Sequence, residues 1–248
     1  MLINIIFCKD NCLYIYRMEK LEYLKKYSAD ISFVDFSLLP EEISSTLPEY
    51  WRDILSVADT ELRHQLLFNE WSKYSYQYQS TLNYLRVNLL KVELIFNNSK
   101  YSLLYSVKNR SGNIVFYEGR NPYTKEVPAV IGLIWDSIPK SFTNVYDQLH
   151  NGWVYFSSQS NGILPIEDVF ILGDLDWGIL DDIDAASLPF NLGTCVGFFS
   201  NGLGDYASID LSSRDKNTGF IWWHAKPPKL NVEIWPVIDE WTMIGIEK

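Results

Sequence analysis

Hydrophobic and polar positions along this chain of 248 residues change their period more than once. Between residues 17 and 71 the hydrophobic positions recur every three or four residues, as in "RMEKLEYLKKY", which predicts helices. Two Pro-Glu pairs, which begin at Pro40 and Pro48, place proline and an acidic side chain where the first turn of a helix favours them. Asp59 or Thr60 is suited to cap a further helix. We therefore expect residues 17–71 to be mostly helical.

The next part of the chain has patterns that predict β-strands. Residues 74–79 ("YSYQYQ") alternate, and residues 92–118 hold three β-rich runs joined by "NNSK" and "NRSGN", which is typical of an antiparallel meander. A strand, a turn and a second strand are also predicted for residues 1–16. The polar stretch "RNPYTKEVP" predicts a boundary. We expect an N-terminal extension, residues 1–125, and a second domain, residues 126–248, unless the extension continues the same sheet.

The second half of the chain is predicted to combine helices with several strands. A helix begins near Pro139, where hydrophobic positions recur at i, i+3, i+4 and i+7, and it ends at "HNG" (150–152), whose Asn or Gly suits a left-handed cap. Pro236 opens a closing helix. The Asn-Gly pairs at 161–162 and 201–202 are predicted turns. Strands are predicted near residues 195–200, 206–211 and 219–224.

The composition favours a folded protein with a substantial core and an acidic surface. Hydrophobic residues make up 47% of the chain and aromatic residues 15%, which favours sheets with cross-strand aromatic pairs. The formal net charge of −10 disfavours direct binding to nucleic acid, because the phosphate backbone would be repelled. The same acidity favours a basic protein partner.

The cysteines and the length of the apolar runs indicate in which cellular compartment the protein is expected. Cys8, Cys12 and Cys195 show no framework spacing, so free thiols in a reducing compartment are favoured over a bridge between Cys8 and Cys12. No run approaches the about 20 apolar residues of a membrane span, and the apolar N-terminus is too short for a signal peptide. We therefore expect a cytoplasmic protein without membrane association.

Three histidines are candidates for catalysis or metal binding. None of His64, His150 and His224 has a Cys, His or carboxylate at metal-ligand spacing, so a structural role is favoured for each and no metal site is predicted. Catalysis stays open, because the members of a catalytic group are often distant in sequence. For an enzyme, we expect His224 to act with Asp205 or Asp210, although the chain has no nucleophile motif of the G-x-S-x-G type.

The segment "GDLDWGILDDID" concentrates acidic side chains. It lacks the glycine at position six and the terminal glutamate of an EF-hand. A cation site, paired carboxylates for acid/base chemistry and a solvated acidic face are its three competing uses, and the solvated face is favoured. Such a face is also a docking surface for a basic protein. The acidic residues are Asp174, Asp176, Asp181, Asp182 and Asp184.

The stretch "FFSNGLGDYASIDLSSRDKNTGFIWWHAKPP" combines glycines, carboxylates and a histidine. Its Gly-x-Gly lies between two predicted strands, so no helix N-terminus is available to hold a phosphate. The glycines suit turns that need positive φ angles. We therefore interpret the stretch as scaffold and expect no cofactor.

The second half of the chain also resembles a known family. "IPKSFTNVYDQLHNGW", "SNGILPIEDVFIL", "VGFFSNGLGDYASIDL", "GFIWWHAKP" and "IDEWTMIG" are similar, in this order, to successive segments of the SUKH superfamily, the Smi/Knr-type domain. The resemblance covers about residues 130–248. It implies an α+β fold in which helices pack on one side of a mixed or antiparallel twisted sheet.

The resemblance also implies roles for particular residues and for the whole chain. Bacterial members of the family are mostly immunity proteins of polymorphic or contact-dependent toxin systems, which bind a cognate toxin without catalysis, whereas fungal members regulate cell-wall synthesis. The positions that match the family motifs are implied to be structural. They are Pro139, Asn151, Gly152, Gly162, Pro165, Gly202, Gly204, Asp205, Asp210, Trp222, Trp223 and Trp241.

Three functions therefore compete. The leading hypothesis is a non-catalytic immunity protein whose acidic segment, with exposed Trp153 and Trp177, contacts a cognate toxin domain, such as a basic nuclease. Packing in the core is the alternative for both tryptophans. The second is a regulatory or scaffold protein of the same fold with an endogenous partner. The third is an enzyme that uses His224 with Asp205 or Asp210.

Overall fold

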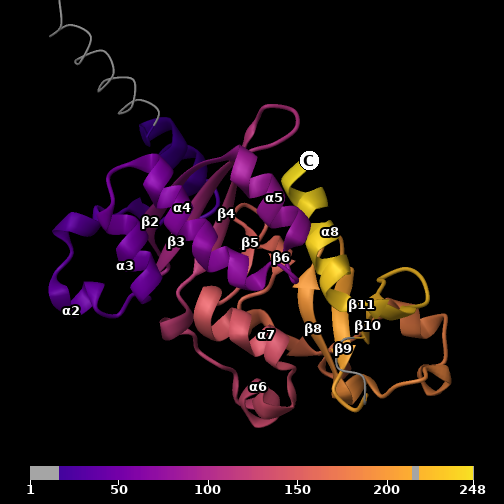
Figure 1. Cartoon of the computed structure of the whole chain (residues 1–248). Helices are drawn as coiled ribbons and strands as arrows, with labels where there is room; N and C mark the ends of the chain where they lie inside the picture. Colours follow the sequence, from indigo (N-terminus) through magenta and orange to yellow (C-terminus); the bar gives the residue numbers. More distant parts are fainter. Residues whose placement is uncertain (1–16, 214–217, 248) are drawn as a thin grey trace, which may run out of the picture.

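The computed structural model describes residues 17–213 and 218–247, and within them the chain has an α+β fold (Figure 1). One antiparallel sheet has the order β1-β2-β3-β4-β5-β6-β8-β9-β10-β11, and β7 pairs with β8 beside this path. The strand, turn and strand predicted for residues 1–16 lie outside the described residues, as do Cys8 and Cys12. The strands are β1 (Ser32–Phe33), β2 (Leu89–Asn97), β3 (Lys100–Lys108), β4 (Ile114–Arg120), β5 (Trp153–Tyr155), β6 (Ser160–Ile163), β7 (Phe170–Ile171), β8 (Cys195–Ser200), β9 (Tyr206–Asp210), β10 (Thr218–Trp222) and β11 (Lys229–Glu233).

Most of the α-helices pack on one face of this sheet. The buried side chains of α3, α4, α5, α7 and α8 form one continuous core with that face (Figure 1). The opposite face is covered in two places, by the helix at residues 17–25 and by the segment at residues 172–192. The α-helices are residues 17–25, α2 (Glu41–Ser44), α3 (Glu49–Ser56), α4 (Thr60–Trp71), α5 (Gln79–Asn88), α6 (Ala129–Ile134), α7 (Lys140–Asn144), which continues as a π-helical turn (Val145–Leu149), and α8 (Ile234–Glu247).

Several local predictions are confirmed. Residues 17–71 are largely helical, with α2 and α3 beginning directly after Pro40 and Pro48. Asp59 caps α4, since its carboxylate accepts a hydrogen bond from the Leu62 N–H at 2.8 Å. The meander predicted at 92–118 is β2–β4, and the predicted strands of the last quarter are β8, β9 and β10.

The turns that precede α5 contradict the alternation seen in residues 74–79. In a strand Tyr74, Tyr76 and Tyr78 would share one face, but Tyr74 and Tyr78 are buried and Tyr76 is exposed, because the backbone turns instead of extending. The first turn of α5 is also held from a distance, because the Asp239 carboxylate on α8 accepts the N–H groups of Ser80 and Thr81 at 2.7 and 2.9 Å. No local pattern predicts such a cap.

Two further elements differ from the expectation. Asn161 and Gly162 do not form a turn but lie within β6, where Asn161 has a φ of +51°. Strand β11 was not predicted, because it is an edge strand whose side chains are mostly exposed and carries little hydrophobic pattern.

The sheet runs through the predicted boundary near residue 125. Strands β4 and β5, which lie on either side of it in the sequence, pair through Tyr117–Tyr155 and Gly119–Trp153. The division into residues 1–125 and 126–248 therefore stays a prediction about folding units, while the sheet itself is continuous.

Candidate partner-binding surface

The acidic segment lies across the sheet face opposite the α-helical layer. It follows β7 as three single turns of 3-10 helix, at Leu172–Asp174, Gly178–Asp181 and Ala185–Ser187. Its hydrophobic side chains, with Ile179 buried to 5% exposure, pack on Cys195, Phe220 and Trp222 of the sheet. The side chains of all five predicted aspartates are exposed.

Trp177 anchors this segment to the sheet. Its indole N–H donates to the carbonyl oxygen of Leu172 at 2.7 Å. Its ring contacts those of Phe170, Tyr206 and Trp222, with centroids 5.4 to 6.2 Å apart. Trp177 remains partly exposed, so it both fixes the segment and presents an aromatic edge among the carboxylates.

The carboxylates of the segment have few partners among the described residues. Asp184 caps the last of the three turns by accepting the Ala186 N–H at 2.9 Å. Among the described residues, none of the other four aspartates takes part in an ion pair. The segment therefore presents uncompensated negative charge on a fixed backbone.

Trp153 does not belong to this surface, so the prediction that it is exposed was wrong. Its side chain is 2% exposed and stacks on Tyr117 at 4.3 Å between ring centroids, with Trp71 and Tyr105 at its other sides. Trp153 lies on the face of β5 that the helices cover, and a strand of three residues carries no alternation from which its inward face can be recognised.

The residues that match the family motifs lie at turns and in the core. Gly152, Gly202 and Gly204 have φ angles of +80°, +76° and +92°, which favour glycine. The Asn151 side chain accepts the Ile166 N–H at 2.9 Å and thereby ties the end of the π-helical turn to the segment that follows Pro165. The remaining residues are Pro139 before α7, Gly162 in β6, Asp205 at the turn after β8, Asp210 at the end of β9, Trp222, which is fully buried, and Trp223 and Trp241, whose rings contact each other.

The structure brings His224 together with Asp205 but not with Asp210. The ring Nδ1 of His224 lies 2.7 Å from a carboxylate oxygen of Asp205, which also accepts the His224 backbone N–H at 3.0 Å. Burial raises the pKa of Asp205, but these hydrogen bonds and one from Asn201 outweigh it, so the pKa is lower than usual. Asp210 instead accepts hydrogen bonds from Thr194 and Ser212.

The Asp205–His224 pair therefore links the turn after β8 to the end of β10. Asp205 is buried at the turn, whereas the side chain of His224 is 56% exposed. One Asp-His pair orients an imidazole, but acyl or glycosyl transfer also needs a nucleophile or a second carboxylate. The side-chain amide of Asn201 donates a further hydrogen bond to the Asp205 carboxylate at 2.8 Å.

His150 is buried in the core under the α-helical layer, and Cys195 is buried under the acidic segment. His150 is fully buried, and its Nε2 lies 2.7 Å from the Tyr105 hydroxyl. Burial lowers the pKa of His150 to about 3, so the ring is neutral at physiological pH. Burial raises the pKa of the Cys195 thiol to about 12, which makes it a poor nucleophile. His64 is half-buried on α4, and burial lowers its pKa as well.

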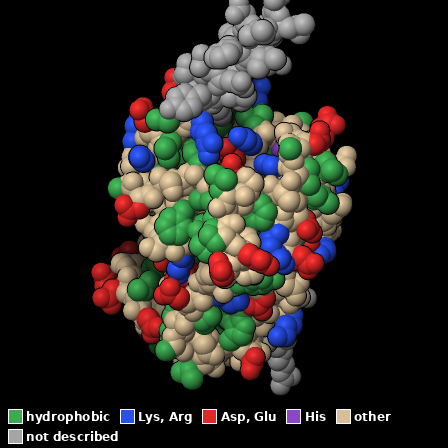
Figure 2. All heavy atoms as spheres, turned by 90° about the vertical axis from the view of Figure 1, so that its left-hand side faces the viewer, with side chains coloured by type: hydrophobic (Ala, Val, Ile, Leu, Met, Phe, Trp, Pro, Cys, Tyr) green, Lys and Arg blue, Asp and Glu red, His purple; other side chains and the backbone are tan. Residues whose placement is uncertain are grey.

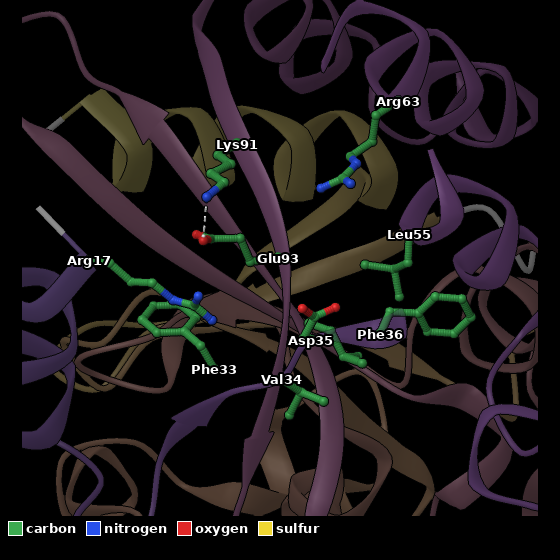
Figure 3. A pocket seen from close by; sticks show the side chains of 10 residues that line it. Arg17, Phe33, Val34, Asp35, Phe36, Leu55, Arg63, Lys91 and Glu93 are labelled. Carbon is green, nitrogen blue, oxygen red and sulfur yellow. Dashed lines mark ion pairs between the residues drawn. The ribbon is translucent and has the colours of Figure 1, made fainter. Parts of the chain in front are cut away.

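A hollow at the other end of the molecule was not predicted (Figure 3). It is lined by Arg17, Lys91 and Arg63, which come from the helix at residues 17–25, from β2 and from α4. Because these cations are far apart in the sequence, no spacing motif predicts that they lie together. Figure 2 shows the left-hand side of the molecule in Figure 1. Basic and acidic side chains are mixed on this face, although the whole chain is acidic.

Within residues 17–213 and 218–247, no group of three or more His, Cys, Asp or Glu side chains is placed to hold a metal ion. No helix in the described part of the chain is both long enough and apolar enough to cross a membrane. Comparison with protein-family models, with characterised proteins and with solved structures gives no match. The similarity to SUKH domains therefore stays a prediction from the sequence.

Replacing His224 by alanine tests whether the Asp205–His224 pair is structural. We expect His224→Ala to lower the free energy of unfolding by about 1 kcal/mol, because a charge-assisted hydrogen bond is lost at a partly exposed position. Urea denaturation measures this change. Binding to the protein partner should be unaffected. Unchanged stability together with the loss of a biological activity would instead support the enzyme hypothesis.

Proposed function

We propose that this chain is a non-catalytic immunity protein that binds a cognate toxin domain and neutralises it. The observation that carries the proposal is the acidic segment: exposed, uncompensated carboxylates on a backbone that Trp177 fixes to the sheet. A basic toxin domain, such as a nuclease with a phosphate-binding surface, is the partner that this charge fits. The net charge of −10 and the resemblance to SUKH domains support the same function, which implies a cytoplasmic location.

The fixed geometry of the segment matters for how the inhibitor would act. Long-range attraction between opposite charges steers association and raises the rate constant at low salt. Because the backbone is already ordered, little conformational entropy is lost when the carboxylates meet their partners. Trp177 adds a partly exposed aromatic edge at the centre of the charge, where interfaces concentrate their binding energy.

The first experiment is co-expression with the C-terminal domain of a neighbouring toxin-like gene. Rescue of growth and co-purification of both chains would support immunity. A well-folded chain that neither rescues growth nor co-purifies would favour the second candidate, a regulatory or scaffold protein of the same fold, and a pull-down of endogenous partners would follow. The Asp205–His224 contact keeps an enzyme as the third candidate.

Charge reversal in the acidic segment should slow association with the toxin domain. We expect Asp181→Lys with Asp182→Lys to lower the association rate constant at least about tenfold at low salt, with the fold intact, because both side chains are exposed. Stopped-flow mixing at several salt concentrations measures the effect, which should shrink as salt rises.

The matched control is Glu41→Lys with Glu42→Lys. These neighbouring acidic residues are also exposed, but they lie on α2, on another part of the molecule, so the net charge changes equally (Figure 1). Equal slowing by both double variants would mean that only the overall charge matters. No slowing by the Asp181/Asp182 pair would exclude the acidic segment as the docking surface.

A further inference from the structure

The hollow drawn in Figure 3 is a small, strongly charged cavity of about 180 Å³. The charged ends of Arg17, Lys91 and Arg63 lie around its open space, and Asp35 lies on the other side. Ligand sites for drug-sized molecules begin at about 300 Å³, so this cavity suits a smaller ligand.

Positive charge exceeds negative charge around this cavity. Glu93 is already satisfied, because it pairs with Lys91 at 2.7 Å and with the buried Lys20. Among the described residues, Arg17 and Arg63 take part in no ion pair. Three cations, Arg17, Lys91 and Arg63, therefore face two carboxylates, Glu93 and Asp35, in a protein whose overall charge is −10.

Arg63 is held in place without a carboxylate. Its Nε donates to the carbonyl oxygen of Val57 at 3.0 Å, and one of its terminal nitrogens donates to the same oxygen. Its other terminal nitrogen lies 3.4 Å from the carbonyl oxygen of Val92, a distance at which a hydrogen bond is weak. The guanidinium is thus oriented by the backbone and keeps donor capacity for a ligand.

The neighbouring positive charges also affect the pKa of Lys20. Burial lowers the pKa of Lys20, and Lys91 and Arg17 lower it further, while Glu93 opposes them. Lys20 donates a second hydrogen bond to Ser106 at 2.7 Å, so the protein supplies polar partners but only one carboxylate. An anion in the cavity would relieve this repulsion.

The remaining residues that line the cavity indicate which other chemical groups an anionic ligand would have. The Asp35 carboxylate accepts hydrogen bonds from the Ser37 N–H at 3.0 Å and hydroxyl at 2.7 Å, and its pKa is lowered by them. Asp35 would repel a bare anion but would accept a hydrogen bond from a hydroxyl group of a ligand. Phe36 and Leu55 supply apolar walls beside it.

We propose that this cavity binds the phosphate group of a small hydroxylated phosphate ester. The phosphate lies between Arg17, Lys91 and Arg63, which donate charge-assisted hydrogen bonds to its oxygens. A hydroxyl of the ligand donates to Asp35. This site is separate from the acidic segment and does not depend on toxin binding.

Isothermal titration of the full chain with inorganic phosphate and with glycerol 1-phosphate tests the site. Both should bind to the wild-type chain, and glycerol 1-phosphate should bind more tightly. Arg17→Gln and Lys91→Gln should each weaken both ligands by about tenfold, since each removes a charge-assisted hydrogen bond. Asp35→Asn should strengthen the binding of inorganic phosphate and reduce the preference for the ester.

The matched control is Arg110→Gln, which removes the same charge from a side chain that is 73% exposed and pairs with Glu247 on α8. It should leave both affinities unchanged. The absence of heat with either ligand at millimolar concentration overturns the proposal. An equal loss of affinity in Arg110→Gln and Arg17→Gln overturns it as well, because the binding would then follow net charge rather than this cavity.

Discussion

Replacing Gly162 by alanine should destabilise the fold by at least about 3 kcal/mol, the upper range for overpacking in a protein core. A Cβ at this position would lie 1.9 Å from the carbonyl oxygen of Trp153, and the obstacle is backbone, which cannot rotate away. β5 and β6 would have to separate at the pairing of Trp153 with Ile163. Urea denaturation monitored by tryptophan fluorescence measures the loss.

Gly178→Ala is the matched control for this substitution. A Cβ on Gly178 meets no atom within 4 Å, and its backbone does not have a positive φ. We expect its stability to be unchanged or higher by up to about 1 kcal/mol, since alanine restricts the unfolded chain. Similar stability of Gly162→Ala and the wild type would contradict the close approach of β5 and β6 at this position.

Mild acid should destabilise this protein through His150. The folded chain holds the His150 pKa at about 3, whereas an unfolded histidine has a pKa near 6.5. The unfolded state therefore binds a proton first as the pH falls, and stability that is fully present above pH 6.5 is lost between 6.5 and 3. The slope approaches about 1.4 kcal/mol per pH unit below the unfolded pKa.

Two variants separate this effect from other titrations. His150→Gln removes the buried imidazole, so its unfolding free energy should be lower at pH 7, but it should fall much less than that of the wild type between pH 6.5 and 5. His64→Gln is the control, because burial also lowers the pKa of His64, but that side chain is only half-buried. A wild-type chain that is equally stable at pH 7 and pH 5 would contradict the assignment.

The sequence was sufficient where local chemistry decides the structure. The carboxylate at Asp59, the prolines before α2 and α3, and the β-rich runs with the turns between them in β2–β4 each act within a few residues. These features predicted most helices and the meander, whereas the α+β class was implied by the resemblance to SUKH domains.

The sequence was insufficient where distant segments decide it. The cap on α5 comes from Asp239, the inward side of Trp153 depends on which face the helices cover, and Asp205 rather than Asp210 reaches His224 because of the turn after β8. The cavity around Arg63 needs three separate elements before it exists. In each case the residue types were visible in the sequence, but their neighbours were not.

The segment at residues 172–192 has an inward side that packs on the sheet and an outward side that is exposed. Ile179 and Trp177 pack with Cys195, Phe220 and Trp222, while Asp181 and Asp182 are exposed. Substitutions at the outward positions therefore cost little stability, and those at the inward positions cost much. The outward surface of this segment can therefore vary in sequence and charge while the fold beneath it is preserved.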